Sequence, residues 1–270
     1  MDAFICTACG TQYTPTSAAP EACAICDDER QYVPPGGQRW ITLARLQRSH
    51  MSAFRDEAGL IGVGMTPAFA IGQRALLVPA GSGHVLWDCV SLVSDVAVDL
   101  IKGIGGLKAI AISHPHYYTS MVEWSRAFGG IPVYLHQADR EWIMRPDSCL
   151  ELWNGDTREI APGLTLVRAG GHFEGGTVLH WAQGCDGRGA LLSGDVLQVV
   201  ADRKHLGFMR SYPNYIPLGA AAVARIAERV MPHKFDAIYG AFWDRVIPCD
   251  GHRVLENSVA RHIEWLQRLV

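Results

Sequence analysis

The sequence has little net charge and no long apolar segment. Its 270 residues include 24 Lys or Arg and 27 Asp or Glu, which gives a net charge of −3. A chain this close to neutral is not built to hold a polyanion over its whole surface, and no apolar run approaches the roughly 18 residues that cross a bilayer. The first residues also lack the basic and apolar regions of a secretory signal. We therefore expect a cytoplasmic protein without a membrane or nucleic-acid partner.

The sequence also lacks internal repeats and low-complexity tracts. Hydrophobic residues make up 49% of the chain and charged residues 19%, which is a globular balance and excludes disorder as the main state. The length fits one large domain plus a small one.

Four of the eight cysteines occur in two Cys-x-x-Cys pairs, Cys6 with Cys9 and Cys23 with Cys26. Each such turn points two thiolates at one position, and two turns complete a tetrahedral site of four sulfurs. We expect structural zinc, whereas iron in the same cage would make an electron-transfer centre. Two disulfides are the alternative, but the rest of the chain has no mark of an oxidising compartment. The metal would supply most of the folding energy of this short segment.

A Pro-Pro-Gly-Gly break at residues 34–37 separates two regimes of composition. It predicts a small metal-binding domain over residues 1–38 and a larger domain over residues 39–270. The larger part alternates apolar runs of strand length with segments of helical period, which predicts a layered α/β domain. The expected strands are Ala75–Pro79, His84–Asp88, Ala109–Ser113, Ile131–His136, Leu164–Ala169, Val178–Ala182, Ala190–Ser193 and Asp236–Tyr239. The expected helices are Leu92–Ile101, Thr119–Phe128, Pro217–Met231 and Val254–Leu269.

Polar side chains of metal-binding type follow three of these strands. His114 and His116 come after the first, and residues at i and i+2 of extended backbone point the same way. His172 lies in a Gly-rich loop, where glycine lets the backbone turn sharply. Asp195 follows the third strand. Alone, a His-x-His pair is more often a pair of surface or hydrogen-bonded histidines than a metal site.

In this order the motifs resemble those of the metallo-β-lactamase fold superfamily, over roughly residues 60–250. The resemblance matches His114 and His116 to the family's first histidine pair, His172 to its Gly-His loop and Asp195 to its bridging aspartate. Asp88 matches the aspartate that ends an early strand of the family. The resemblance implies an αββα sandwich with the metal site at one edge of the sheets, preceded here by a rubredoxin-like zinc ribbon.

The sequence departs from the family pattern at three ligands of the second metal. Tyr118 and Thr119 stand where the family has Asp and His, and residues 239–243 contain no counterpart of its last His. The departures imply either a mononuclear site that holds zinc or another divalent metal, or no metal at these histidines, rather than a two-metal site.

Three imidazoles on one ion leave a fourth position open, where a water has its pKa lowered toward about 7. Asp195 then either completes the ligand set or orients that water. Tyr118 is a candidate hydrogen-bond donor to an oxyanion. The expected function is a metal-dependent hydrolase in which hydroxide attacks an ester, thioester, lactone or amide carbonyl of an unknown small-molecule substrate.

Two other functions fit the same residues. The loss of second-site ligands also fits a catalytically inactive scaffold that binds a partner. An iron redox protein is the third alternative, since some relatives of the fold pair a di-iron site with rubredoxin. The sequence leaves the substrate and the oligomeric state open.

Overall fold

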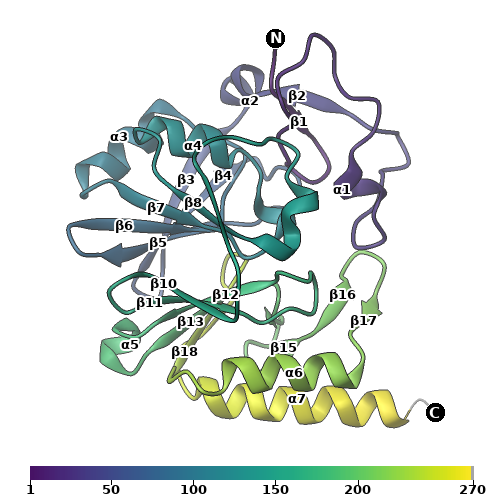
Figure 1. The fold of residues 1–270 in the computed structure, drawn as a ribbon, viewed down its shortest axis with the longest axis vertical. Coiled ribbons are helices and arrows are strands. Elements are labelled where there is room, and N and C mark those ends of the chain that lie inside the picture. The colour runs from purple at the N-terminus through teal and green to yellow at the C-terminus, as the bar shows by residue number, and fades with distance from the viewer. Residues whose placement is uncertain (269–270) are drawn as a thin grey trace. The chain divides into compact units, whose positions relative to one another are not determined.

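The computed structural model describes residues 1–268 and divides the chain into two compact units (Figure 1). The first comprises Met1–Leu135 and Arg140–Leu152, and the second comprises His136–Asp139 and the chain from Trp153 onward. Leu269, the expected end of the last helix, and Val270, the expected end of the second domain, lie outside the described residues.

The first unit is built on a seven-stranded sheet in the order β3-β4-β5-β6-β7-β8-β9. Its strands from β3 to β6 are antiparallel, whereas β6, β7 and β8 run parallel. The strands are β3 (Met51–Glu57), β4 (Leu60–Thr66), β5 (Ala75–Ala80), β6 (Gly83–Trp87), β7 (Leu107–Ala111), β8 (Val133–His136) and β9 (Leu150–Trp153). Most side chains of β5 and β7 are apolar and buried.

Helices α3 and α4 lie over one face of this sheet (Figure 1). Helix α3 (Asp95–Gly103) begins after Ser94, whose hydroxyl accepts a hydrogen bond from the Ala97 amide and so caps the helix. Helix α4 spans Met121–Ala127. The shorter helices α1 (Ala24–Asp27) and α2 (Leu43–Ser49) and the 3-10 helices η1 (Pro115–Tyr117) and η2 (Gln137–Trp142) lie in the connections.

The N-terminal segment joins the first unit through its own two-stranded sheet. Strand β1 (Phe4–Cys6) pairs antiparallel with β2 (Trp40–Thr42). Ile5 is fully buried and packs against Leu46 of α2 and Leu92. The second strand of this small sheet therefore follows residue 38, and the domain boundary expected there stays a prediction.

The second unit contains a six-stranded sheet in the order β10-β11-β12-β13-β18-β19. Its strands are β10 (Thr157–Ala161), β11 (Leu164–Arg168), β12 (Thr177–Trp181), β13 (Ala190–Gly194), β18 (Ala237–Gly240) and β19 (Val246–Ile247). Two short ribbons accompany it, formed by β14 (Gln198–Val199) with β15 (Leu206–Gly207) and by β16 (Met209–Ser211) with β17 (Ile216–Pro217). Residues Gly184–Gly187 form the short α5.

Helices α6 (Ala220–Val230) and α7 (Gly251–Arg268) lie side by side in the second unit (Figure 1). The apolar side chains of α6 recur at helical spacing and are buried, so one stripe of the helix faces the core. They pack with Leu191 and Ile238 from the sheet and with Leu255 from α7 into one cluster.

All twelve expected strands and helices have a counterpart, with ends shifted by a few residues. Strands β5 and β6 pair antiparallel as a hairpin that closes at Ala80 and Gly83. No helix within residues 1–268 is long and apolar enough to cross a membrane.

Candidate metal centres

The four paired cysteines lie together in the first unit. Cys6 ends β1, Cys9 lies in the turn that follows, and Cys23 and Cys26 flank the start of α1. The Gly10 amide donates to the Cys6 carbonyl oxygen at 2.9 Å, and the Cys26 amide donates to the Cys23 carbonyl oxygen at 2.9 Å. These two tight turns point all four thiols inward, and the four Sγ atoms lie within 4.8 Å of one another.

The sulfur positions fit a tetrahedral metal ion. Sγ–Sγ distances are 3.6 Å between Cys6 and Cys26 and 3.6 Å between Cys9 and Cys23. A tetrahedron with metal–sulfur bonds of about 2.3 Å has edges of about 3.8 Å, whereas a disulfide requires about 2.05 Å. The predicted clustering of the cysteines is confirmed, and the two disulfides do not form.

The surroundings of the sulfurs favour negative charge that a cation must balance. The Gln38 amide donates to Cys6 Sγ at 3.0 Å, and the Tyr13 hydroxyl donates to Cys23 Sγ at 3.4 Å. Hydrogen bonds from Cys23 and Cys26 lower the pKa of the Cys6 thiol, whereas burial raises the pKa of the Cys9 thiol. A bound cation removes this conflict because it stabilises all four thiolates at once.

His114 and His116 follow β7 in the first unit, and both are buried. Their ring centroids lie 5.1 Å apart, and each offers a ligand atom within 4.8 Å of the other. The expectation of extended backbone through both histidines is wrong. Only His114 is extended, with φ −171° and ψ 172°, because Pro115 starts the 3-10 helix η1, which contains His116.

Asp88 and Ser113 hold the start of this loop. Asp88 follows β6 with φ +62°, and its Oδ1 accepts a hydrogen bond from the Ser113 amide at 2.8 Å. The Ser113 hydroxyl lies 2.9 Å from His114 Nδ1. Because this contact engages Nδ1, it orients the ring so that Nε2 is the atom available to a metal. The predicted place of Asp88, just past an early strand, is confirmed.

Tyr118 and Thr119 complete the same loop and are buried. Tyr118 directly follows η1, and its amide donates to the Pro115 carbonyl oxygen at 3.2 Å. Thr119 has φ +33°, a conformation that is strained for a β-branched residue. Neither side chain supplies the Asp or His of the family pattern.

His172 lies in the loop between β11 and β12 of the second unit. Gly170 and Gly171 precede it with φ +73° and +84°, values that glycine adopts readily. His172 Nδ1 lies 3.0 Å from the carbonyl oxygen of Met209. A carbonyl can only accept, so Nδ1 carries the proton and Nε2 is the unprotonated atom. This is the tautomer that binds metals through Nε2.

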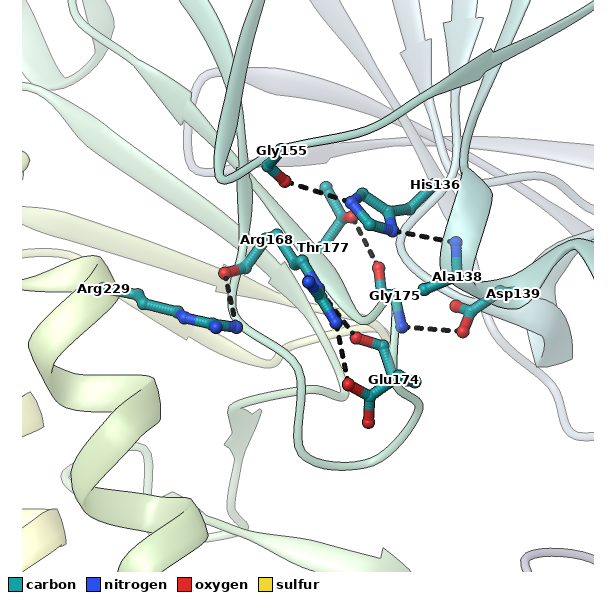
Figure 2. Close-up of polar contacts among 9 residues, drawn as sticks. All are labelled: His136, Ala138, Asp139, Gly155, Arg168, Glu174, Gly175, Thr177 and Arg229. Atoms are coloured by element: carbon teal, nitrogen blue, oxygen red, sulfur yellow. Dashed lines mark hydrogen bonds and ion pairs between the residues drawn. The ribbon is translucent and has the colours of Figure 1, made fainter.

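The far side of the His172 loop is fixed by polar contacts (Figure 2). Asp139 Oδ1 accepts a hydrogen bond from the Gly175 amide at 2.7 Å, and the Thr177 hydroxyl donates to the Gly175 carbonyl oxygen at 2.8 Å. Arg168 donates to the Glu174 carbonyl oxygen at 3.0 Å and pairs with its side chain at 2.7 Å. These contacts therefore fix the backbone of the loop at Glu174 and at Gly175.

Asp195 directly follows β13 in the second unit and is 4% exposed. The Tyr212 hydroxyl donates to its backbone carbonyl oxygen at 2.7 Å, and the Tyr212 ring lies 5.7 Å from the His172 ring. Burial and the nearby Asp195 charge raise the pKa of Tyr212, so its hydroxyl stays protonated as a donor. His172 and Asp195 each offer a ligand atom within 4.8 Å of the other.

The structure thus pairs His114 with His116 in the first unit and His172 with Asp195 in the second. Both pairs consist of side chains that bind divalent metals. Sequence reasoning missed Asp139 and the tyrosine at position 117, which is fully buried with its ring 4.5 Å from that of His114. No local pattern marks Asp139, because its hydrogen bond with the Gly175 amide joins residues far apart in the chain.

No family model matches the chain. The chain is 43% identical over 269 residues to "Uncharacterized protein YmaE" of Bacillus subtilis (strain 168), and the match covers 98% of this chain and 97% of that protein. Among solved structures it is similar to VMB-1, with a TM-score of 0.60 and 14% identity over 80% of this chain and 98% of that one. It is also similar to the DIM-1 metallo-beta-lactamase, with a TM-score of 0.58 and 13% identity over 78% and 96%.

These similarities show the metallo-β-lactamase fold, which confirms the fold class implied by the sequence. The N-terminal cysteine cluster agrees with the expected zinc ribbon. The fold alone does not identify an activity, because one fold serves many functions.

Proposed function

The chain belongs to the family of Bacillus subtilis YmaE. From the His and Asp donor set and the orientation of two of its imidazoles, we propose that it is a mononuclear metal-dependent hydrolase. In this proposal His114, His116, His172 and Asp195 hold one divalent ion. The cysteine cluster holds a separate structural zinc.

The orientation of two imidazoles carries the proposal. His172 and His114 each have Nδ1 engaged in a hydrogen-bond contact, with the Met209 carbonyl oxygen and the Ser113 hydroxyl respectively. A metal-binding histidine is typically held in this way, because the contact fixes the ring and presents Nε2. A histidine on the surface does not need buried hydrogen-bond partners that fix the orientation of its ring and its tautomer.

The donor set of three imidazoles and one carboxylate suits zinc and related divalent ions. Such an ion supplies a nucleophile near neutral pH by acidifying water. Asp195 either binds it or, one water removed, orients the nucleophile and accepts its proton. Tyr118 carries a phenol hydroxyl, which in this proposal donates a hydrogen bond to the oxyanion that forms on the attacked carbonyl.

A single ion follows from the residues at the departing positions. Tyr118 and Thr119 replace the carboxylate and imidazole of the family pattern, and residues 239–243 offer no imidazole. A phenol and a hydroxyl are poor ligands for a second zinc ion. The proposed substrates are esters, thioesters, lactones or amides, whose hydrolysis needs one nucleophile and one oxyanion donor.

Metal content and hydrolysis test the proposal together. We expect zinc-loaded protein to hold two metal equivalents per chain, one of which is lost in His116→Ala together with hydrolysis of a panel of small ester, thioester, lactone and amide substrates. The matched control is His205→Ala, because His205 pairs with Asp202 at 2.6 Å on an exposed turn and lies in neither metal-binding pair.

Three outcomes would contradict the proposal. A single equivalent that disappears in Cys6→Ser would leave the histidines without metal and would favour a binding scaffold. A third equivalent would show a dinuclear centre. Visible colour from iron in the cysteine site would favour the redox alternative, because zinc in that site is colourless.

A further inference from the structure

The first cysteine turn lies directly on the loop that carries His114 and His116. The Gln12 amide donates to the Thr119 carbonyl oxygen at 3.1 Å. The Ser91 hydroxyl donates to the Gly10 carbonyl oxygen at 3.0 Å, and Ser91 is 2% exposed. All of these residues belong to the first unit, so the contact lies within one compact body.

The approach of the turn to Ser91 is close enough to require glycine. Gly10 has φ +84°, and a Cβ placed on it would lie 2.6 Å from Ser91 Oγ and 3.3 Å from the Ala70 side chain. Real Cβ atoms do not approach other atoms so closely, so a side chain at this position would displace either the turn or the Ser91 hydroxyl. With glycine at position 10, the turn lies directly against the Ser91 side chain.

The segment that contains Ser91 also holds both ends of the histidine loop. Asp88 accepts from the Ser113 amide at the start of the loop. The Ser120 hydroxyl donates to the Ser91 carbonyl oxygen at 2.8 Å at its end. Ser91 therefore contacts the cysteine turn through its hydroxyl and the histidine loop through its carbonyl oxygen.

The loop needs such support because Thr119 is strained. A β-branched residue at φ +33° is in an unfavourable conformation and persists only where its surroundings hold it. The Gln12 amide holds the carbonyl oxygen of this very residue. The Gln12 side chain in turn accepts from Arg145, which pairs with Glu123 of α4 at 2.6 Å.

The cysteine turn is closed by a few backbone hydrogen bonds and by the antiparallel pairing of Ile5 with Gln12. Between β1 and Gln12 it consists of the Cys6–Cys9 turn, closed by the Gly10 amide and by the Cys6 amide, which donates to the Thr11 carbonyl oxygen at 3.0 Å. Cys6 and Cys9 lie on either side of this turn, so a metal ion bound to both sulfurs would lock it.

We propose that Ser91 is a positioning residue through which the metal-loaded cysteine cluster fixes the loop of His114 and His116. Metal occupancy at the cysteines thereby controls the affinity of the histidine centre for its own metal. The inference rests on the proposed function, because it assumes that these histidines bind a metal.

Cobalt(II) titration separates the two sites by spectrum, since cysteine-bound cobalt shows thiolate charge-transfer bands and histidine-bound cobalt shows only weak d–d bands. In Ser91→Ala we expect unchanged thiolate bands and about 10- to 100-fold weaker cobalt binding at the histidines, the usual effect of losing an outer contact. The matched control is Ser94→Ala, which removes a hydroxyl of the same segment that caps α3 and contacts the Ser52 hydroxyl at 2.7 Å. It leaves both cobalt affinities unchanged.

Hydrogen exchange in His172→Ala provides a second test that does not depend on Ser91 variants folding. This variant keeps the sequence of the loop that carries His114 and His116. It also weakens metal binding at the histidine centre, so that the chelator acts mainly on the cysteine-bound metal. Chelation of metal from its cysteines is expected to speed amide exchange across residues 113–120 and to leave β3 and β4 unchanged.

The inference is overturned if Ser91→Ala and the natural protein bind cobalt at the histidines with equal affinity. It is also overturned if amide exchange across residues 113–120 is the same with and without metal at the cysteines. Natural protein without any histidine-bound cobalt would instead overturn the proposed function. In that case the exchange experiment still decides whether the cysteine cluster fixes the loop.

Discussion

Asp139 is expected to determine the stability of the His172 loop. Its side chain is 1% exposed, and Oδ1 accepts a hydrogen bond of 2.7 Å from the buried Gly175 amide (Figure 2). Asp139→Ala removes the acceptor and leaves that amide buried. Hydrogen bonds to charged groups contribute about 1.5–3 kcal/mol, so we expect the free energy of unfolding to fall by about 2 kcal/mol.

Urea denaturation and hydrogen exchange measure this effect. With a typical dependence of about 2 kcal/mol per molar urea, the unfolding midpoint of Asp139→Ala falls by about 1 M. The Gly175 amide exchanges about 30-fold faster, since about 1.4 kcal/mol corresponds to a factor of ten. Asp139→Asn keeps an acceptor oxygen without its charge, and we expect about half the loss.

Glu174→Ala is the matched control in the same loop. Glu174 pairs with Arg168 at 2.7 Å, but its side chain is 80% exposed, so its loss has an effect of less than about 1 kcal/mol. The reasoning is refuted if Asp139→Ala unfolds at the same urea concentration as the natural protein, or if it is no less stable than Glu174→Ala.

Burial lowers the pKa of His136, whose Nδ1 accepts from the Ala138 amide, so the folded state resists its protonation. The unfolded state binds that proton more readily, so the free energy of unfolding is greatest above the ordinary pKa of histidine and falls as the pH drops from about 7.5 to about 5.5. In His136→Gln, urea titrations at several pH values are expected to show a weaker dependence of the unfolding free energy on pH. Leu255→Ala removes a fully buried side chain from the α6–α7 core and lowers the unfolding free energy by about 2–5 kcal/mol in calorimetry or urea titration, whereas Leu100→Ala, at a 53% exposed position, changes it by less than about 0.5 kcal/mol. A slope unaffected by His136→Gln, or equal effects of the two leucine variants, contradicts these expectations.

The sequence predicts the elements whose signals are local. The hairpin of β5 and β6 follows from two apolar runs around Gly81-Ser82-Gly83, and the cysteine cluster follows from spacing alone. The sequence does not predict strands β3 and β4. Apolar and polar residues do not alternate strictly along β3, and glycines interrupt the apolar residues of β4. Strands of two residues, such as β14 and β19, are too short to show any period.

The residues of the candidate sites likewise divide into those with a local sequence signal and those without one. The histidines and Asp195 were recognisable because each lies just past a strand. The error at His116 came from treating the backbone as extended, although Pro115 is a residue that commonly begins a helical turn. The contacts of Asp139 with Gly175 and of Tyr212 with Asp195 join residues far apart in the chain. No periodicity or spacing rule reaches such pairs, because they arise only from packing.

The pairing of β1 with β2 has a practical consequence for anyone who seeks a minimal fragment of this protein. A chain trimmed to start at residue 39 keeps β2 but loses its only partner strand among residues 1–268, together with Ile5, which covers Leu46 and Leu92. The trimmed fragment would present bare amides and carbonyls beside apolar side chains, the surface that recruits other chains into aggregates. Recombinant work on the larger part should therefore retain the N-terminal ribbon.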